Sequence, residues 1–141
     1  MPRVADDVRI TVEQLGGRAR VSSGSPWEPK VGYCRAVRSG DLISVSGTVG
    51  INADGSYPRT AGDQTRRALV IIRAAIEALG GRLEHVVRTR MFVTDIGTFD
   101  EIGRAHGEVF GAIRPATSMV EVSRLVDEAA VVEIEADAVV G

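Results

Sequence analysis

The sequence has few of the residues on which many functional sites depend. Among its 141 residues there are one cysteine and two histidines. Cys34 alone cannot form an internal disulfide, and together with His85 and His106 it fits no known spacing of zinc ligands. These shortages predict a domain that needs no oxidising compartment and holds no metal ion.

An excess of charge and a long apolar run are also missing. The 17 Lys and Arg residues against 19 Asp and Glu give a net charge of −2, which creates no general attraction to nucleic acid or to an anionic membrane. Arg73 and Glu77 interrupt the longest apolar stretch, from Ala68 to Leu79, well short of the roughly 20 residues that span a bilayer. Because the first residues also lack the apolar segment of a signal peptide, we expect a soluble cytoplasmic protein without nucleic-acid or membrane partners.

The hydrophobic content of 44% predicts one globular domain with a core of its own. Apolar residues at helical spacing predict a helix over Thr60–Leu79, capped by Thr60 with Asp63 and ended by Gly80. A second helix is predicted over Thr98–Phe110, with a capping box of Thr98 and Glu101 and with Gly111 at its end. The residues predicted to face inward are Ala68, Leu69, Ile72, Ala75, Ile76 and Leu79 in the first helix, and Phe99, Ile102, Val109 and Phe110 in the second.

Stretches rich in β-branched residues predict the strands. With the two helices they give the order β-β-α-β-α-β-β, an α+β fold with one mixed sheet and two helices on one face. Val and Ile on the uncovered sheet face predict a homo-oligomer. The predicted strands are Tyr33–Arg38 and Leu42–Ser46, joined by the three residues Ser39 to Asp41, then Val86–Thr94, then Ser118–Leu125 and Val131–Val140 as a closing pair; Val8–Glu13 and Arg18–Ser22 form an additional hairpin or a loose arm.

Three groups of residues leave two interpretations open. Alternation in the last strand places Glu133, Glu135 and Asp137 on one face, either as a solvated edge or as carboxylates that line a cleft between subunits. Cys34 beside Arg35 is either a thiol with a lowered pKa or a small buried strand residue. The two histidines are either structural or functional, and nothing around them in the sequence predicts a catalytic triad.

Several segments resemble the RidA/YjgF family, which is also known as the L-PSP endoribonuclease family. The resemblance covers about residues 32 to 140 and implies a homotrimeric, chorismate-mutase-like α+β barrel. It divides the chain into an extension or hairpin over residues 1–22 and one domain over residues 23–141. The matching segments are Gly32-Tyr33, Ser46-Gly47, Phe92 to Asp95 with Phe99, Arg114 to Leu125, and Val132 to Ala136.

The resemblance also implies a small-molecule site in each cleft between neighbouring subunits. In the deaminase branch of the family these clefts hydrolyse enamine and imine acids to 2-keto acids and ammonia without a cofactor. Carried over by position, Tyr33 and Glu133 are the catalytic residues, and Glu133 holds or activates water. The residues that would bind substrate are Ser46, Gly47, Thr117 and Met119.

The sequence departs from this family pattern at one important position. Thr117 stands where the deaminases have the arginine that binds the substrate carboxylate, and Met119 stands where they have a cysteine. A buried carboxylate left without its partner costs about 2–5 kcal/mol, whereas Thr117 offers one neutral hydrogen bond. The sequence therefore predicts hydrolysis of an imine, an enamine or a related C–N bond on a substrate without that carboxylate. The alternative is a catalytically silent ligand-binding or regulatory trimer.

The older family name also suggests a third possible activity, the cleavage of RNA. Four arginines, Arg66, Arg67, Arg88 and Arg90, could form a local basic patch. The single tryptophan and the balanced charge disfavour RNA binding, because RNA-binding surfaces combine basic residues with aromatic rings. We therefore interpret these arginines as solvated faces of a helix and a strand.

Overall fold

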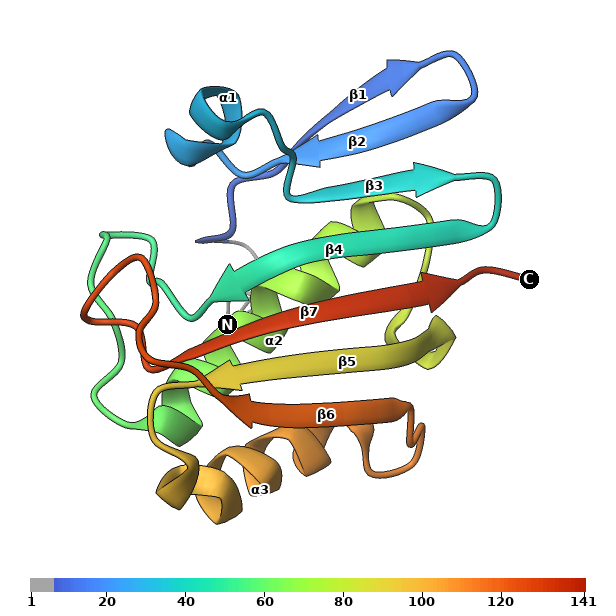
Figure 1. Cartoon of the computed structure of the whole chain (residues 1–141). Coiled ribbons are helices and arrows are strands. Elements are labelled where there is room, and N and C mark those ends of the chain that lie inside the picture. Colours follow the sequence, from blue (N-terminus) through green and yellow to red (C-terminus); the bar gives the residue numbers. More distant parts are fainter. Residues whose placement is uncertain (1–6) are drawn as a thin grey trace.

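The computed structural model describes residues 7–141, so the first six residues of the predicted extension lie outside the described part. Seven strands form one sheet in the order β1-β2-β3-β4-β7-β5-β6, as Figure 1 shows. Neighbouring strands are antiparallel except β5 and β6, which are parallel. The strands are β1 Thr11–Leu15, β2 Arg18–Ser22, β3 Ala36–Ser39, β4 Leu42–Val49, β5 Val86–Val93, β6 Ala116–Glu121 and β7 Val132–Val139.

Two long helices lie on one face of this sheet. The helix α2 (Ala61–Ala78) lies across β4 and β7, and α3 (Phe99–Phe110) lies beside β5 and β6 (Figure 1). This arrangement confirms the predicted α+β architecture. Three short segments were not predicted: α1 (Trp27–Val31), which ends at Gly32 with a φ of 90°, and the 3-10 turns η2 (Leu83–His85) and η3 (Ile96–Thr98).

The first long helix forms as its sequence predicts. The hydroxyl of Thr60 accepts a hydrogen bond from the Asp63 amide at 3.1 Å and so caps the helix. Its six predicted inward residues are all buried, and Ile72 and Ile76 are completely inaccessible to solvent. Burying one such side chain contributes about 1.5–3 kcal/mol, so this stripe fixes α2 against the sheet.

The predicted range of α3 is confirmed to within one residue, with Thr98 as its N-cap residue, but the predicted capping box of Thr98 and Glu101 is wrong. Thr98 lies in η3, where its hydroxyl donates to the Asp95 carbonyl at 2.6 Å instead of capping α3. Asp95 begins this turn by accepting a hydrogen bond from the Gly97 amide, and Glu101 accepts one from the Gly62 amide at 2.6 Å. Phe99 is 54% exposed, because the earlier turn rotates it away from the core that Ile102 and Phe110 enter.

Two predictions about strand pairing are also wrong. The last two strands do not form a closing pair, because β7 lies between β4 and β5 and pairs with both. The α3 crossover places β6 parallel to β5 on its far side, so the space between β4 and β5 remains for β7. In the β3–β4 hairpin Ser39 pairs with Leu42, so the connection has the two residues Gly40 and Asp41 and not three.

The two faces of the sheet carry different side chains. On the face covered by α2 and α3, which we call the inner face, β7 places Val132, Ile134, Ala136 and Ala138 in the core. The opposite face, which we call the outer face, carries the partly exposed Glu133, Glu135 and Asp137 from the same strand, as the alternation predicts. Exposed apolar side chains, Leu42 and Val139, lie next to one another at one end of that face.

No helix in residues 7–141 is long and apolar enough to cross a membrane. The hairpin of β1 and β2 extends the sheet beyond β3, with Val21 of β2 completely buried.

Candidate functional site

A bulge in β4 is the local feature around which the first half of the predicted site is built. Val45 pairs with Ala136 and Thr48 pairs with Ile134, so three steps along β4 face two steps along β7. The extra residue lies in the Ser46-Gly47 segment, which the family resemblance had singled out. Bulges redirect side chains and are frequent beside active sites.

Glu133 lies directly over Gly47. A Cβ atom added at Gly47 would come within 2.8 Å of the Glu133 carboxyl carbon and of one of its oxygens, so glycine lets the carboxylate keep this position. Burial raises the pKa of Glu133 above its ordinary value, and the neighbouring Glu135 raises it further, while the charge of Arg35 acts in the opposite direction. A carboxyl group held in this way can exchange a proton closer to neutral pH than a solvated one.

Arg35 connects the predicted catalytic residues, although the sequence indicated only that it lies beside Cys34. Its Nη2 atom donates to the Gly47 carbonyl at 2.9 Å, and its guanidinium lies 5.6 Å from the centre of the Tyr33 ring. Arg35 is only 8% exposed, and its Nε atom has no hydrogen-bond partner among the described residues. The alternation of a strand that begins at Tyr33 would have placed Arg35 on the same side as the tyrosine.

The Ser46 hydroxyl is already committed as a donor. It donates to the Cys34 carbonyl at 2.7 Å, so it can offer a ligand only its lone pairs. Cys34 itself is partly buried and forms no disulfide. Tyr33 is 37% exposed and its backbone amide donates to the Glu28 carbonyl, which ties this position to α1.

Tyr57 lies close enough to Glu133 to be affected by its charge, and the sequence did not predict it. Burial, followed by the charges of Asp127 and Glu133, raises the pKa of Tyr57 to about 12. The Tyr57 phenol therefore stays protonated and can act as a hydrogen-bond donor. The two loops that carry Tyr57 and Asp127 lie at the same end of the sheet in Figure 1, where β4 ends and β7 begins. The two residues are 70 positions apart, and no local sequence motif predicts that their loops lie at the same end of the sheet.

Thr117 and Met119 lie in a different place. They pair with Thr89 and Met91, whose side chains are buried on the inner face, whereas Glu133 lies on the outer face. Glu133 pairs with Phe92, so Thr117 is also displaced by about 10 Å along β5. One copy of the chain thus brings together Tyr33, Ser46, Gly47 and Glu133 and keeps Thr117 and Met119 apart from them.

The predicted basic patch is largely neutralised. Arg66 contacts Asp63 and Glu108, Arg67 contacts Asp7, and Arg90 lies 3.4 Å from Asp137 and 3.7 Å from Glu135. Within residues 7–141, no group of three His, Cys, Asp or Glu side chains could hold a metal ion.

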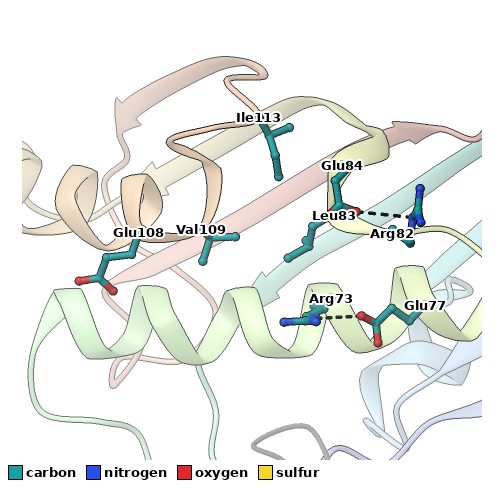
Figure 2. Close-up of a pocket in the computed structure, with 8 residues that line it drawn as sticks. All are labelled: Arg73, Glu77, Arg82, Leu83, Glu84, Glu108, Val109 and Ile113. Carbon is teal, nitrogen blue, oxygen red and sulfur yellow. Dashed lines mark hydrogen bonds and ion pairs between the residues drawn. The ribbon is translucent and has the colours of Figure 1, made fainter.

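A groove of about 400 Å³ lies away from all these residues, between α2, η2 and the end of α3. Figure 2 shows its apolar residues, Leu83, Val109 and Ile113, with charged side chains around them. The charges pair locally, Arg73 with Glu77 at 2.8 Å and Arg82 with Glu84 at 3.6 Å. This groove therefore contains none of the predicted site residues.

The comparisons with known proteins identify the family of this chain. The family model described as endoribonuclease L-PSP matches residues 24–140. The chain belongs to this family, the RidA/YjgF family. A solved member, Rv2704 from Mycobacterium tuberculosis, described as belonging to the YjgF/YER057c/UK114 family, is 49% identical with a TM-score of 0.81, over 87% of this chain and 99% of that one.

Two curated relatives are similar over most of their length. SCO2049 from Streptomyces coelicolor, an uncharacterized protein, is 38% identical over 84% of this chain and 90% of its own length. The protein named 2-iminobutanoate/2-iminopropanoate deaminase from Escherichia coli is 34% identical over 76% of this chain and 86% of its own length. The family therefore includes deaminases of 2-imino acids, which is consistent with a deaminase-type role.

Proposed function

We propose that this protein hydrolyses the C=N bond of an imine, or of the imine formed from an enamine, on a substrate without the usual carboxylate. The observation that carries the proposal is the Glu133 carboxylate, which lies over Gly47 with its pKa raised by burial. Arg35 and Tyr57 interact with its charge, and Tyr33 packs against Arg35, so groups that donate hydrogen bonds or carry positive charge lie on this side of the sheet. Such groups can hold a water molecule and can protonate a nitrogen leaving group, and this chemistry requires no cofactor.

The proposed reaction needs one proton carrier. Water attacks the carbon of the protonated imine, and Glu133 takes a proton from that water as the C–O bond forms. Glu133 then gives this proton to the nitrogen of the carbinolamine. The C–N bond breaks as the hydroxyl proton returns to Glu133, and the products are a carbonyl compound and ammonia, which takes up the remaining proton. An iminium carbon is already electrophilic, so positioning of the water supplies much of the acceleration.

We further propose that the complete site forms between neighbouring copies of a homotrimer. Family members are typically homotrimers, and the separation of Thr117 and Met119 from Glu133 within one chain is the geometry that a shared cleft requires. The outer face of one copy would supply Glu133, and the β6 edge of the next would supply Thr117. Among residues 7–141, β6 pairs with β5 alone, so its other edge is available to a second copy.

A ligand-binding or regulatory trimer is the second candidate. Thr117 and Met119 favour it, because neither replaces the charge of the arginine found in the deaminases. Such a protein would bind small molecules in the same clefts and release no ammonia. RNA cleavage receives no comparable support, since Arg66, Arg67 and Arg90 are engaged by carboxylates.

Ammonia release tests the proposal directly. The imine of alaninamide, generated in situ, is an uncharged counterpart of 2-iminopropionate, and its spontaneous hydrolysis gives the baseline. We expect the protein to accelerate ammonia release above that baseline and Glu133→Gln to reduce the acceleration by about 10²- to 10⁴-fold. Asp137→Asn, on the same face of the same strand, is the matched control and should retain the activity. A wild-type protein no faster than its heat-denatured sample would favour the ligand-binding alternative.

A further inference from the structure

A continuous hydrogen-bond chain leads from Thr117 into the core. The Thr117 hydroxyl lies 2.7 Å from the Thr89 hydroxyl, and the Thr89 hydroxyl lies 2.9 Å from Nε2 of His106. The three residues come from β6, β5 and α3. Thr117 is exposed, Thr89 is completely buried and His106 is 8% exposed. The chain therefore connects the position that replaces the family arginine with a buried imidazole.

The surroundings of His106 keep its ring neutral. Burial lowers the pKa of His106 below its ordinary value and is the only cause of the shift. Its ring packs on that of Phe110 with the centres 4.7 Å apart. The charged residues of the facing strand, Arg88 and Arg90, alternate with Thr89 and so point to the outer face. At neutral pH one ring nitrogen therefore carries a proton and the other accepts.

Two orientations of this hydrogen-bond chain are possible, because the roles of Nε2 and of the two hydroxyls depend on which ring nitrogen of His106 carries the proton. Nε2 faces the Thr89 hydroxyl, while Nδ1 has no hydrogen bond to any of residues 7–141. A proton on Nε2 is satisfied by Thr89 within the protein, whereas a proton on Nδ1 would have only water as its acceptor, and the first arrangement is the one that we adopt. With the proton on Nε2, His106 donates to Thr89. Each hydroxyl has one proton, so Thr89 then donates to Thr117 and Thr117 donates outward.

We infer that Thr89 and His106 are positioning residues that turn Thr117 into a fixed hydrogen-bond donor for an uncharged carbonyl oxygen of the ligand. The inference rests on the proposed function only in placing Thr117 in the ligand cleft. The opposite orientation of the chain would present lone pairs at Thr117 and would select an N–H or O–H group. The ligand class that fits the donor orientation is an amide or ester of a 2-oxo or 2-imino acid.

The position of the histidine proton can be measured without any assay of activity. In ¹⁵N NMR spectra of the whole protein, we expect the neutral His106 ring to carry its proton on Nε2. His85 is an internal reference, because its Nδ1 accepts from the Arg82 amide at 2.9 Å and so leaves its proton on Nε2. A proton on Nδ1 of His106 would overturn the inference.

Binding of two probes tests the consequence for the ligand. Methyl pyruvate offers carbonyl acceptors without a charge, and pyruvate offers a carboxylate; both are titrated in the same spectra. Thr89→Val and His106→Leu should each weaken methyl pyruvate binding roughly 3- to 10-fold, which is the value of one neutral hydrogen bond. His106→Gln, whose side-chain amide can donate from near the Nε2 position, should restore most of the affinity, which a loss of packing alone would not predict.

Two outcomes separate this inference from the proposed function. Unchanged methyl pyruvate affinity in folded Thr89→Val would overturn the inference even if the enzyme is active. A protein that hydrolyses no imine, yet carries the proton on Nε2 and binds methyl pyruvate through Thr89, would support the inference and overturn the proposed hydrolysis. If His106→Leu does not fold, Thr89→Val gives the result on its own, since valine has nearly the shape of threonine.

Discussion

The two halves of the proposed cleft differ in charge and in construction. The half on β3, β4 and β7 holds Glu133 against Gly47, with the buried Arg35 beside them. The half on β5, β6 and α3 holds Thr117, supported by Thr89 and His106, and none of these three carries a charge at neutral pH. The first half contains groups that can move protons, and the second contains a single neutral donor. In the proposed cleft, the groups for chemistry and the group for ligand selection would therefore come from opposite faces of the sheet.

Adding charge to the neutral half should have a large effect. Thr117→Arg would supply a guanidinium that can form two charge-assisted hydrogen bonds to a carboxylate. We expect ammonia release from 2-iminopropionate to rise by about 10²-fold in kcat/KM, and release from the uncharged amide to fall. Ser118→Arg, the next residue and on the opposite face, is the control and should change neither rate. An unchanged preference in Thr117→Arg would show that Thr117 does not contact the ligand.

Disturbing the charged half should cost somewhat less. The methyl group of Gly47→Ala would meet the Glu133 carboxylate at 2.8 Å, and the flexible side chain would move away. A displacement of about 1 Å in a catalytic group reduces turnover by up to about 10²-fold. Gly103→Ala makes the same change in open space within α3, and it should leave turnover intact. If Gly47→Ala and Gly103→Ala have the same turnover, the position of Glu133 does not matter for catalysis and the account is contradicted.

Removing the charge of Arg35 should change the pH dependence of the reaction. Arg35 opposes the effect of burial on Glu133, so the pKa of Glu133 should rise further in Arg35→Met. A higher pKa leaves less carboxylate at neutral pH, and we expect the pH–rate profile to move toward higher pH with a several-fold loss near neutrality. Arg20→Met, which removes an exposed arginine paired with Glu13, should leave the profile in place.

The smallest effect concerns stability. The pKa of Glu133 is higher in the folded protein than in the unfolded chain, so folding favours its protonated form. This contribution to the free energy of unfolding is complete below the ordinary pKa and is lost as the pH rises through the folded-state pKa. Glu133→Gln removes it, so the variant should gain stability relative to wild type between about pH 4 and pH 8. Urea unfolding at both pH values measures the change, and a constant difference would contradict it.

Local patterns in the sequence predicted much of this arrangement. Alternation in β7 placed Glu133, Glu135 and Asp137 on one face, because strand side chains alternate strictly. Helical spacing identified the buried stripe of α2, and Thr60 was the correct cap. These features depend on residues a few positions apart, so the sequence contains the information directly.

Contacts between distant segments could not be predicted in the same way. Arg35 meets Gly47 through the β3–β4 pairing, and Thr89 meets both His106 and Thr117 through the α3 crossover. The strand β7 lies between β4 and β5 because the rest of the sheet leaves that position open, and no pattern within β7 itself predicts this. The predicted capping box at Thr98 was wrong because of a competing turn: the Thr98 hydroxyl donates to the Asp95 carbonyl in the turn that precedes α3.

Subunit complementation tests most directly whether the two halves meet between copies. Glu133→Gln disables one half, and Thr117→Trp fills the other with a side chain too large for a ligand. In randomly mixed trimers of these two inactive variants, about a quarter of the clefts would combine an intact Glu133 from one copy with an intact Thr117 from the next. We predict that mixing followed by co-refolding restores ammonia release from the uncharged imine to about a quarter of the wild-type level. Mixed trimers that stay inactive would contradict the division of the site between copies.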